Sequence, residues 1–272
     1  RYIAGFGSAG NTTGVAFAGE TPSNTAATEE FNTSIYSPVA GAWASGGTLG
    51  TARYQGGGAG TQTAALIFAG NAYTANTEEY DGTSFSEQNN LNTARRALGG
   101  NGTQTGGYIS TAPGAVANVE EFDGSSWTAA TALPAARNDL VAAGTLTAGL
   151  TFGGQPGHTN ETKEYDGTNW TAGGNLIDGR ASFAGAGLQT AALAFGGDTP
   201  GNVASTEGYD GTSWSTKPNL STAVKMNSAA TAGTNTASLS MTGITPPGPT
   251  TTASEEFTGE TTALNVKTLT SS

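Results

Sequence analysis

The chain of 272 residues contains no cysteine, and charged residues make up only 11% of it. The absence of cysteine excludes disulfide bonds, thiolate nucleophiles and zinc–thiolate centres. Basic residues are especially scarce, because ten lysines and arginines stand against 21 acidic residues, for a net charge of −11. Binding of nucleic acid depends on clustered basic residues, so we expect no nucleic-acid partner.

Long hydrophobic runs and metal-binding patterns are also missing. No apolar run approaches the roughly 18 residues that a membrane-spanning helix needs, so we expect no membrane insertion. The single histidine, His158, is most simply a solvated loop residue. Asp-x-Asp calcium loops and glycine-rich phosphate loops are absent as well. We therefore expect neither a metal nor a cofactor.

What the chain has in abundance is glycine, with 42 residues, and an internal repeat of about 43 residues. Periods of this length are typical of solenoids and β-propellers, in which each repeat needs neighbours to cover its apolar faces. The copies span residues 1–52, 53–94, 95–136, 137–179, 180–223 and 224–272. We expect all six to form a single domain over residues 1–272.

Each copy predicts four short strands, most clearly in the second. Its first strand is rich in glycine and alanine, as expected of a strand crowded near an axis. The continuous apolar run Ala64–Phe68 predicts a second strand covered on both faces, after a turn at Thr61–Thr63. Thr77–Tyr80 predicts the third strand, and Asp81-Gly82 is a strong hairpin signal before an aromatic fourth strand.

An aromatic residue opens the fourth strand of five copies, and a leucine follows it six residues later. The aromatic residues are Trp43, Phe85, Trp127, Trp170 and Trp214, and the leucines are Leu49, Leu91, Leu133, Leu176 and Leu220. So constant a spacing indicates that both side chains fill fixed pockets between adjacent sheets, where burying each stabilises by roughly 1.5–3 kcal/mol. The sixth copy has Thr262 at the aromatic position, so we expect its sheet to be the loosest.

The pattern resembles the kelch repeat. Its marks are an arginine at the repeat start, a glycine pair closing the second strand, an aromatic residue before a turn and a tryptophan after it. In the fourth copy these are Arg137, Gly153-Gly154, Tyr165 and Trp170. The resemblance implies an all-β, six-bladed kelch-like β-propeller with four-stranded antiparallel blades. Kelch repeats by themselves imply no activity.

Sequence segments such as Glu164–Trp170 are also similar to the kelch-like repeats of structural (tail or fibre) proteins of marine bacteriophages. The third copy departs from the pattern, with Thr111-Ala112 in place of the glycine pair, and the first copy carries extra residues between Phe31 and Trp43. The inserted segment contains Ile35, Tyr36 and Pro38. We consider two roles for it, docking a neighbouring chain or packing over its own blade.

In a propeller the loops sort onto two faces. The loops between second and third strands, and those between successive repeats, share one face, which we name the loop face. The second-to-third-strand loops differ in every copy, and variable loops on a rigid scaffold are the usual place for recognition. The candidate ligand-binding residues are Tyr73, His158, Asn160, Asp198 and Asn202. Neutral variation of surface loops is the alternative reading.

Arginine and glutamate recur from copy to copy. The arginines are Arg53, Arg95, Arg137 and Arg180, and the glutamates include Glu78, Glu120, Glu164 and Glu207. A ring of carboxylates could bind metal or transfer protons. Equal recurrence favours a structural task instead, with Arg–Glu pairs joining blades near the axis, because an active site normally breaks the symmetry of its scaffold. The tryptophans Trp43, Trp127, Trp170 and Trp214 are likewise predicted to be structural.

The spacing of the recurring aspartate, glycine and tryptophan residues does not match a known catalytic motif that we considered. Asp166 has Gly167 one residue later and Trp170 four residues later, which does not match the Asp-box of sialidases. We predict a non-catalytic module of a bacteriophage virion surface, tail or fibre. Its partners would be a host surface glycan or a neighbouring virion protein, bound through the loop face. A bacterial cell-surface adhesion or scaffold propeller that binds a protein partner is the alternative, and a glycan-cleaving enzyme is a third.

In either leading case the location is the virion surface or otherwise extracellular. The last repeat ends at its fourth strand, so no strand crosses between the two terminal repeats to close a ring. We therefore expect the parent polypeptide to continue beyond one end, or a partner to brace the seam.

Overall fold

The computed structural model describes residues 4–7, 13–20, 24–32, 48–51, 57–61, 64–70, 73–96, 99–110, 117–225, 228–229, 237–241, 244–245 and 254–258. The chain divides into two compact units, residues 1–45 and residues 46–272. The elements of both are antiparallel β-strands, which confirms the all-β class.

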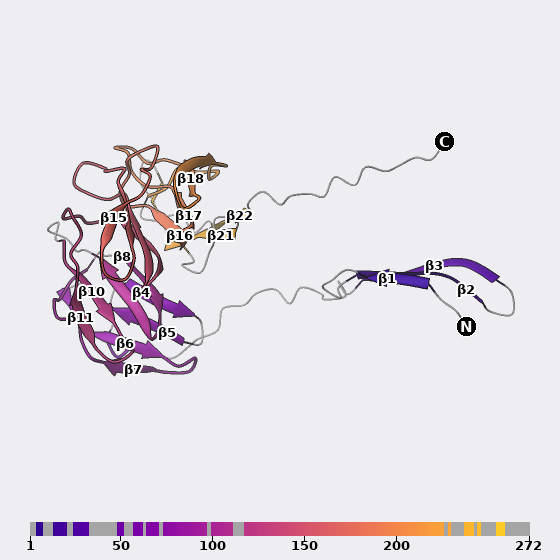
Figure 1. Cartoon of the computed structure of the whole chain (residues 1–272), viewed down its shortest axis with the longest axis horizontal. Coiled ribbons are helices and arrows are strands. Elements are labelled where there is room, and N and C mark those ends of the chain that lie inside the picture. The colour runs from indigo at the N-terminus through magenta and orange to yellow at the C-terminus, as the bar shows by residue number, and fades with distance from the viewer. Residues whose placement is uncertain are drawn as a thin grey trace. The chain divides into compact units, whose positions relative to one another are not determined.

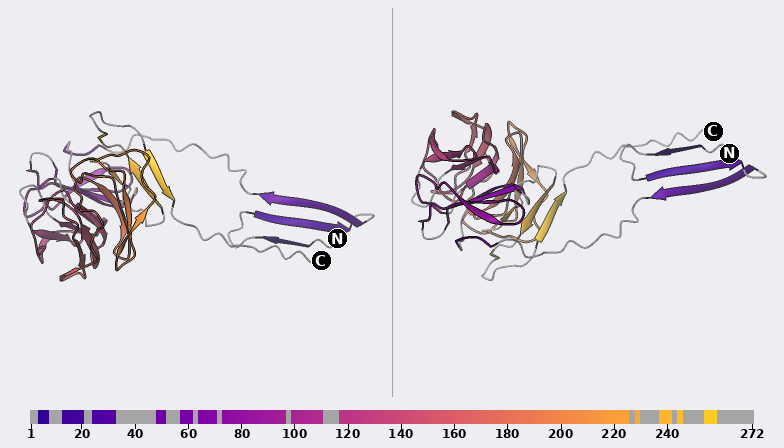
Figure 2. Two further views of the ribbon diagram at one scale, coloured as in Figure 1. Left: turned by 90° about the horizontal axis from the view of Figure 1, so that it is seen from above. Right: turned by 90° about the horizontal axis from the view of Figure 1, so that it is seen from below.

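The first unit contains one three-stranded sheet, drawn in indigo in Figure 2. Its strands are β1 (Ala4–Gly7), β2 (Thr13–Glu20) and β3 (Asn24–Asn32), paired in chain order. The predicted fourth strand with Trp43 lies outside the described residues, as do Ile35, Tyr36 and Pro38.

Among its described residues, the second unit contains four four-stranded sheets, one for each of the second to fifth repeats, and a three-stranded sheet from the sixth (Figure 1). The second and third repeats form β4 (Gly57–Thr61), β5 (Ala64–Phe68), β6 (Thr77–Tyr80), β7 (Phe85–Gln88), β8 (Gly99–Thr103), β9 (Gly106–Ser110), β10 (Val119–Phe122) and β11 (Trp127–Ala130). The fourth and fifth form β12 (Val141–Thr145), β13 (Ala148–Phe152), β14 (Thr162–Tyr165), β15 (Trp170–Ala172), β16 (Ala184–Leu188), β17 (Ala191–Phe195), β18 (Thr206–Tyr209) and β19 (Trp214–Lys217). The sixth forms β20 (Ser228–Ala229), β21 (Ala237–Met241) and β22 (Ser254–Thr258). The predicted strands Ala64–Phe68 and Thr77–Tyr80 are confirmed.

The first strands of successive sheets contact one another, in the order β4, β8, β12, β16 and β20. Their glycine and alanine content follows from this close approach. A Cβ atom added at Gly99 of β8 would lie 2.7 Å from Cδ1 of Leu140 and 3.1 Å from Cβ of Ala142. Four-stranded antiparallel sheets that meet along their first strands are consistent with a β-propeller. Six blades in one closed ring stay a prediction.

Trp127 fills the space between the second and third sheets. Its ring packs edge-on against Phe68 of the preceding sheet, with centroids 5.1 Å apart, and lies at the same distance from Phe122 of its own hairpin. Leu91 closes the same buried cluster. The indole Nε1 donates a hydrogen bond of 2.9 Å to Oγ1 of Thr77. This combination satisfies the polar atom of a buried tryptophan while its ring excludes water.

Trp214 fills the equivalent space between the fourth and fifth sheets. Its ring lies 4.8 Å from Phe152 of the preceding sheet and 5.0 Å from Tyr209 of its own hairpin. Leu176 belongs to the same cluster, and the indole Nε1 donates a 2.9 Å hydrogen bond to Oγ1 of Thr162. Two interfaces therefore share one design, with a phenylalanine, a leucine, a second aromatic ring and a threonine hydroxyl around an indole.

Trp170, between the third and fourth sheets, departs from this design. The third repeat has Ser110 and Val119 where the other two have phenylalanine and threonine, so neither the ring nor the hydroxyl is available. The indole stacks on Tyr165, with centroids 4.6 Å apart, and its Nε1 donates to the backbone oxygen of Thr131. As a result Trp170 is only half-buried.

In the second to fifth repeats, the turn between the third and fourth strands has four residues. In the second repeat the Asp81 carboxylate accepts hydrogen bonds of 2.8 Å from the backbone N–H groups of Thr83 and Ser84. These bonds hold the pKa of Asp81 below its usual range. Gly82 adopts a φ of 92°, a conformation that favours glycine. The Asp-Gly signal is thus explained by a turn that the aspartate side chain closes, and the turn recurs at Asp123, Asp166 and Asp210.

A tyrosine–glutamate hydrogen bond joins successive sheets at the end of the third strand. The Tyr209 hydroxyl donates to Oε1 of Glu164 at 2.5 Å, and the Tyr165 hydroxyl donates to Glu121 in the same way. Burial and the neighbouring carboxylate both raise the pKa of each tyrosine. The third repeat has Phe122 at this position, and the glutamate at the corresponding position of the preceding repeat is Glu79, whose pKa is raised by burial.

This difference predicts the effect of Phe122→Tyr. The added hydroxyl is expected to donate to Glu79, to lower the pKa of that carboxyl and to raise the free energy of unfolding by about 1 kcal/mol. Urea unfolding measures the stability, and NMR titration of the glutamate side chains measures the pKa. Phe122→Tyr combined with Glu79→Ala serves as the control. An equal gain in that background would show that the hydroxyl does not act through Glu79.

Candidate binding site on the loop face

The loops that follow β13 and β17 begin at glycine pairs whose backbone conformations favour glycine. Gly196 and Gly197 have φ values of 67° and 101°. A Cβ atom at Gly197 would also lie 2.5 Å from Cβ of Phe183 and 2.9 Å from the backbone oxygen of Ala181. The pair therefore bends the chain sharply onto the loop face and brings the residue after it, Asp198, beside the start of the same repeat.

Short backbone bridges fix the residues that follow these bends. Asp198 and Ala181 exchange hydrogen bonds of 2.9 and 3.1 Å. Gln155 pairs with Asn138 in the fourth repeat, and Lys225 pairs with Ile244 in the sixth. These bridges extend the sheets onto the loop face, so Gln155, Asp198 and Lys225 are held by backbone contacts rather than by loop packing alone.

Four side chains from three successive repeats meet there. Oδ2 of Asp198 lies 3.4 Å from Nζ of Lys225, and Oδ1 lies 3.9 Å from Nε2 of His158. Nε2 of His158 is also 3.1 Å from Nε2 of Gln155. Lys225, His158 and Asp198 keep 32%, 26% and 21% of their side-chain surface exposed. We name this group, Gln155, His158, Asp198 and Lys225, the polar cluster.

The polar cluster has unused hydrogen-bonding capacity. Oδ1 of Asp198 is buried and has no hydrogen-bond partner among the described residues, since His158 at 3.9 Å is beyond hydrogen-bonding distance. Lys225 offers up to three N–H donors, and the His158 ring donates or accepts according to its tautomer. The cluster therefore contains a cationic donor, Lys225, and an anionic acceptor, Asp198, within a small, partly exposed area.

The sequence predicted two members of the cluster and missed two. His158 and Asp198 come from the variable loops and are brought together. Lys225 follows a repeat start, where the equivalent residues are Arg96, Asn138 and Ala181, so no periodic signal marks it. Gln155 directly follows a glycine pair in the same loop as His158. Only the backbone bridges, which the sequence does not show, place all four residues together.

Two other predicted ligand-binding residues make structural contacts. Nδ2 of Asn160 donates to the backbone oxygen of Leu176 at 3.2 Å, and the Leu176 N–H donates back to Asn160. Nδ2 of Asn202 donates to the backbone oxygen of Ile244 at 2.8 Å. Both amides thus fasten a loop to the next stretch of chain. Tyr73, in the second repeat, has 47% of its surface exposed, and the Arg96 guanidinium lies 4.8 Å above its ring.

The recurring arginines and glutamates of the third and fifth repeats form buried ion pairs. Arg95 pairs with Glu120, and Arg180 pairs with Glu207, with all four side chains nearly fully buried. Arg180 also donates to the backbone oxygens of Gly196 and Ser205. Each glutamate receives backbone N–H donors from the connection that leads into its repeat, for example from Ile177 to Glu207 at 2.7 Å. The pairs therefore fasten each connection to the sheet that follows it.

Arg137 follows a different arrangement from the one that the sequence indicates. Lys163 stands where the neighbouring repeats have Glu120 and Glu207, and Arg137 pairs with Glu161 instead. Although burial alone would raise it, the nearby Arg137 and Lys163 hold the pKa of Glu161 below its usual range. Glu164 accepts the Tyr209 hydroxyl and is not the partner of Arg137. Glu78 accepts the Gly50 N–H at 2.7 Å, and Arg53 lies outside the described residues.

Among the described residues, no group of three or more histidine, cysteine, aspartate or glutamate side chains could hold a metal ion. The same part of the chain contains no helix long and apolar enough to span a membrane. The polar cluster contains no serine, threonine or cysteine nucleophile next to a base, which is the usual geometry of covalent catalysis. Its arrangement suits binding of a polar ligand.

Comparison with known proteins supports the fold. The chain is similar to the solved structure titled "Structure of YjhT", a propeller fold, with a TM-score of 0.66. The match has 13% sequence identity and covers 90% of this chain and 91% of that one. No protein-family model matches the chain, and a search of curated proteins finds no match either. At this identity the likeness defines a β-propeller-like fold and leaves the ligand open.

Proposed function

We propose that this protein is a non-catalytic binding module whose loop face recognises a polar ligand, a host surface glycan, through the polar cluster. The observation that carries the proposal is the convergence of Gln155, His158, Asp198 and Lys225 from three repeats onto one partly exposed area. Sugar hydroxyls both donate and accept hydrogen bonds, so a site with closely spaced donors and acceptors suits them. Binding sites usually orient their ligands through a few such groups.

The proposed setting is the surface, tail or fibre of a bacteriophage virion, where the same face could also contact a neighbouring virion protein. Support comes from the kelch-like repeat pattern and from a chain poor in lysine. In this proposal the repeats form one six-bladed kelch-like ring. A structural match that extends over 90% of the chain supports the ring.

Asp198→Asn tests the role of the polar cluster. The substitution removes the charge that Lys225 and His158 face, and it converts an acceptor oxygen into a donor. On a glycan array we expect wild-type protein to bind at least one glycan, and Asp198→Asn to bind it about tenfold or more weakly. Glu87→Gln is the matched control, because Glu87 is an exposed carboxylate on β7, in a different repeat. Its binding should equal that of the wild type.

Release of cleaved sugar from a bound glycan would contradict the non-catalytic proposal and favour a glycan-cleaving enzyme. Equal glycan binding by both variants would remove the polar cluster from recognition. Finding the chain in purified virions would support the virion module. Finding it only on bacterial cells would favour the second candidate, a cell-surface adhesion or scaffold propeller.

A further inference from the structure

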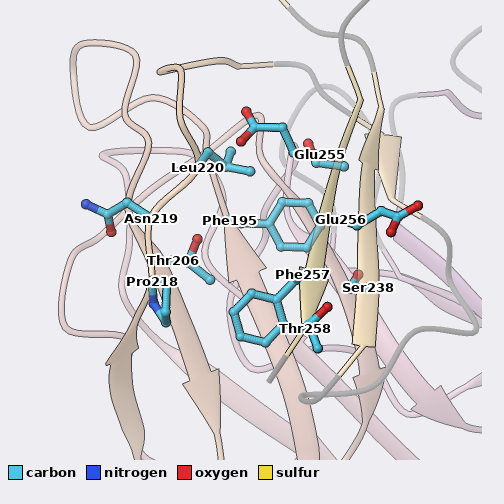
Figure 3. Close-up of a pocket in the computed structure, with 11 residues that line it drawn as sticks. Phe195, Thr206, Pro218, Asn219, Leu220, Ser238, Glu255, Glu256, Phe257 and Thr258 are labelled. Atoms are coloured by element: carbon cyan, nitrogen blue, oxygen red, sulfur yellow. The ribbon is translucent and has the colours of Figure 1, made fainter. Parts of the chain in front are cut away.

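A pocket of about 280 Å³ opens between the fifth and sixth sheets. On the side of the fifth repeat it is lined by Phe195 of β17, Thr206 of β18 and Leu220 of the following connection. On the other side it is lined by Phe257 of β22 and Ser238 of β21. Figure 3 shows the rings of Phe195 and Phe257 in the middle of this group, with Thr206 and Leu220 on one side and Ser238 on the other.

These residues correspond one by one to those that surround a buried indole elsewhere in the chain. Phe195, Thr206 and Leu220 occupy the repeat positions of Phe152, Thr162 and Leu176, which contact or share the cluster of Trp214. Phe257 occupies the position of Tyr209, the second ring against Trp214. The same four positions surround Trp127 two repeats earlier.

The residue that differs is the one at the repeat position of the buried indole. Where the third and fifth repeats have Trp127 and Trp214, the sixth repeat has Thr262, which carries no ring. The sixth interface thus keeps the residues that surround an indole in the other two interfaces, although the sequence has no tryptophan at the corresponding position. Leu220 remains half-exposed, whereas Leu91 and Leu176 keep only 4% and 2% of their surface exposed.

The polar atoms of the pocket point to a ligand with a hydrogen-bond donor. The hydroxyls of Thr77 and Thr162 each accept the indole N–H in the filled interfaces. Thr206 supplies the same hydroxyl here. Ser238 adds a second group, since its Oγ is buried and has no hydrogen-bond partner among the described residues. A buried hydroxyl without a partner is costly, so a ligand whose polar groups reach Ser238 as well as Thr206 gains further binding free energy.

The charge of the lining residues restricts the ligand further. Glu255 and Glu256 both line the pocket, and Glu255 accepts the Ser221 N–H through Oε2 at 2.7 Å. Two carboxylates among the lining residues disfavour an anionic ligand and favour a neutral or cationic one.

We propose that this pocket is a binding site for a planar aromatic ligand of the indole class, which carries an N–H donor and no negative charge. The ring packs against Phe195 and Phe257, and the N–H donates to Thr206. The site is separate from the polar cluster on the loop face, so it does not depend on the proposed glycan recognition.

Isothermal titration calorimetry with indole tests the proposal on the whole chain. We expect saturable binding of one indole per chain, weaker binding of benzothiophene, which has the same shape without the N–H, and weaker binding of indole-3-acetate than of tryptamine. Thr206→Val keeps the shape and removes the acceptor, so it should weaken indole binding about fivefold and leave benzothiophene unchanged. Thr162→Val is the matched control, because its interface already holds Trp214; indole binding should be unchanged.

Thr262→Trp gives an independent readout. The new side chain is expected to fill the pocket, to abolish indole binding and to raise the thermal midpoint. Absence of saturable indole binding to the wild-type chain would overturn the proposal. So would equal affinity for indole and benzothiophene, or undiminished indole binding by a folded Thr262→Trp variant. The ligand comparisons use unmodified protein, so they remain decisive if a variant fails to fold.

Discussion

Arg180→Met is expected to lower the free energy of unfolding by about 3–5 kcal/mol, because it leaves a buried carboxylate without its cation. The Arg180 side chain is 0% exposed and that of Glu207 is 3% exposed, with Nη2 and Oε1 2.6 Å apart. Methionine has a similar length but donates nothing, so Glu207 and the backbone oxygens of Gly196 and Ser205 all lose a donor. Urea unfolding followed by circular dichroism measures the loss.

Arg137→Met is the matched control for Arg180→Met. Arg137 stands at the same repeat position, but its partner Glu161 keeps 44% of its side chain exposed and also contacts Lys163 at 3.4 Å. Water and Lys163 compensate Glu161 after the substitution, so we expect less than half of the loss seen for Arg180→Met. Equal losses in the two variants would contradict the view that burial of the glutamate decides the cost.

A second test concerns the source of the stability loss in Arg180→Met. A large part of the cost should come from the unpaired Glu207 and not from the missing arginine itself. Combining Arg180→Met with Glu207→Met removes the uncompensated charge, so the double variant is expected to lose less stability than the sum of the two single losses. This non-additivity is what distinguishes a buried pair from two independent contacts.

Most of the local structure could be predicted from the sequence because the repeat shows each strand several times. The strands Ala64–Phe68 and Thr77–Tyr80 follow from an apolar run and an Asp-Gly turn, and both signals recur in other copies. A periodic pattern averages out the ambiguity of any single short strand. The same averaging explains why the tryptophan and leucine positions stood out before their surroundings were known.

Contacts made by residues that depart from the repeat pattern were less predictable, and they include the polar cluster. Arg137 pairs with Glu161 because Lys163 interrupts the glutamate position, a substitution that is visible only once the strands are in register. Lys225 reaches Asp198 because a backbone bridge holds it there. Such contacts depend on single residues and on three-dimensional register, so a pattern that is shared by all copies gives no information about them.

Trp214→Ala is expected to lower the free energy of unfolding by about 3–5 kcal/mol, which is the usual cost of truncating a buried tryptophan. The variant loses the contacts with Phe152 and Tyr209 and leaves a cavity between the fourth and fifth sheets. It also leaves the Thr162 hydroxyl without its donor. If all repeats form one ring, circular dichroism in urea should show this loss in a single cooperative transition.

Trp170→Ala provides the comparison within the same molecule, since it removes the same side chain from a half-buried position. Its indole N–H bonds to the backbone oxygen of Thr131 near the surface, and its preceding sheet offers Val119 instead of a threonine. We expect a loss less than half of that for Trp214→Ala. A comparable loss would show that the tryptophan contributes mainly through its own hairpin, where each of the two indoles contacts a tyrosine ring. That result would also count against indole binding in the pocket beside Phe195, because the pocket was inferred from the contacts that an indole makes with the preceding sheet.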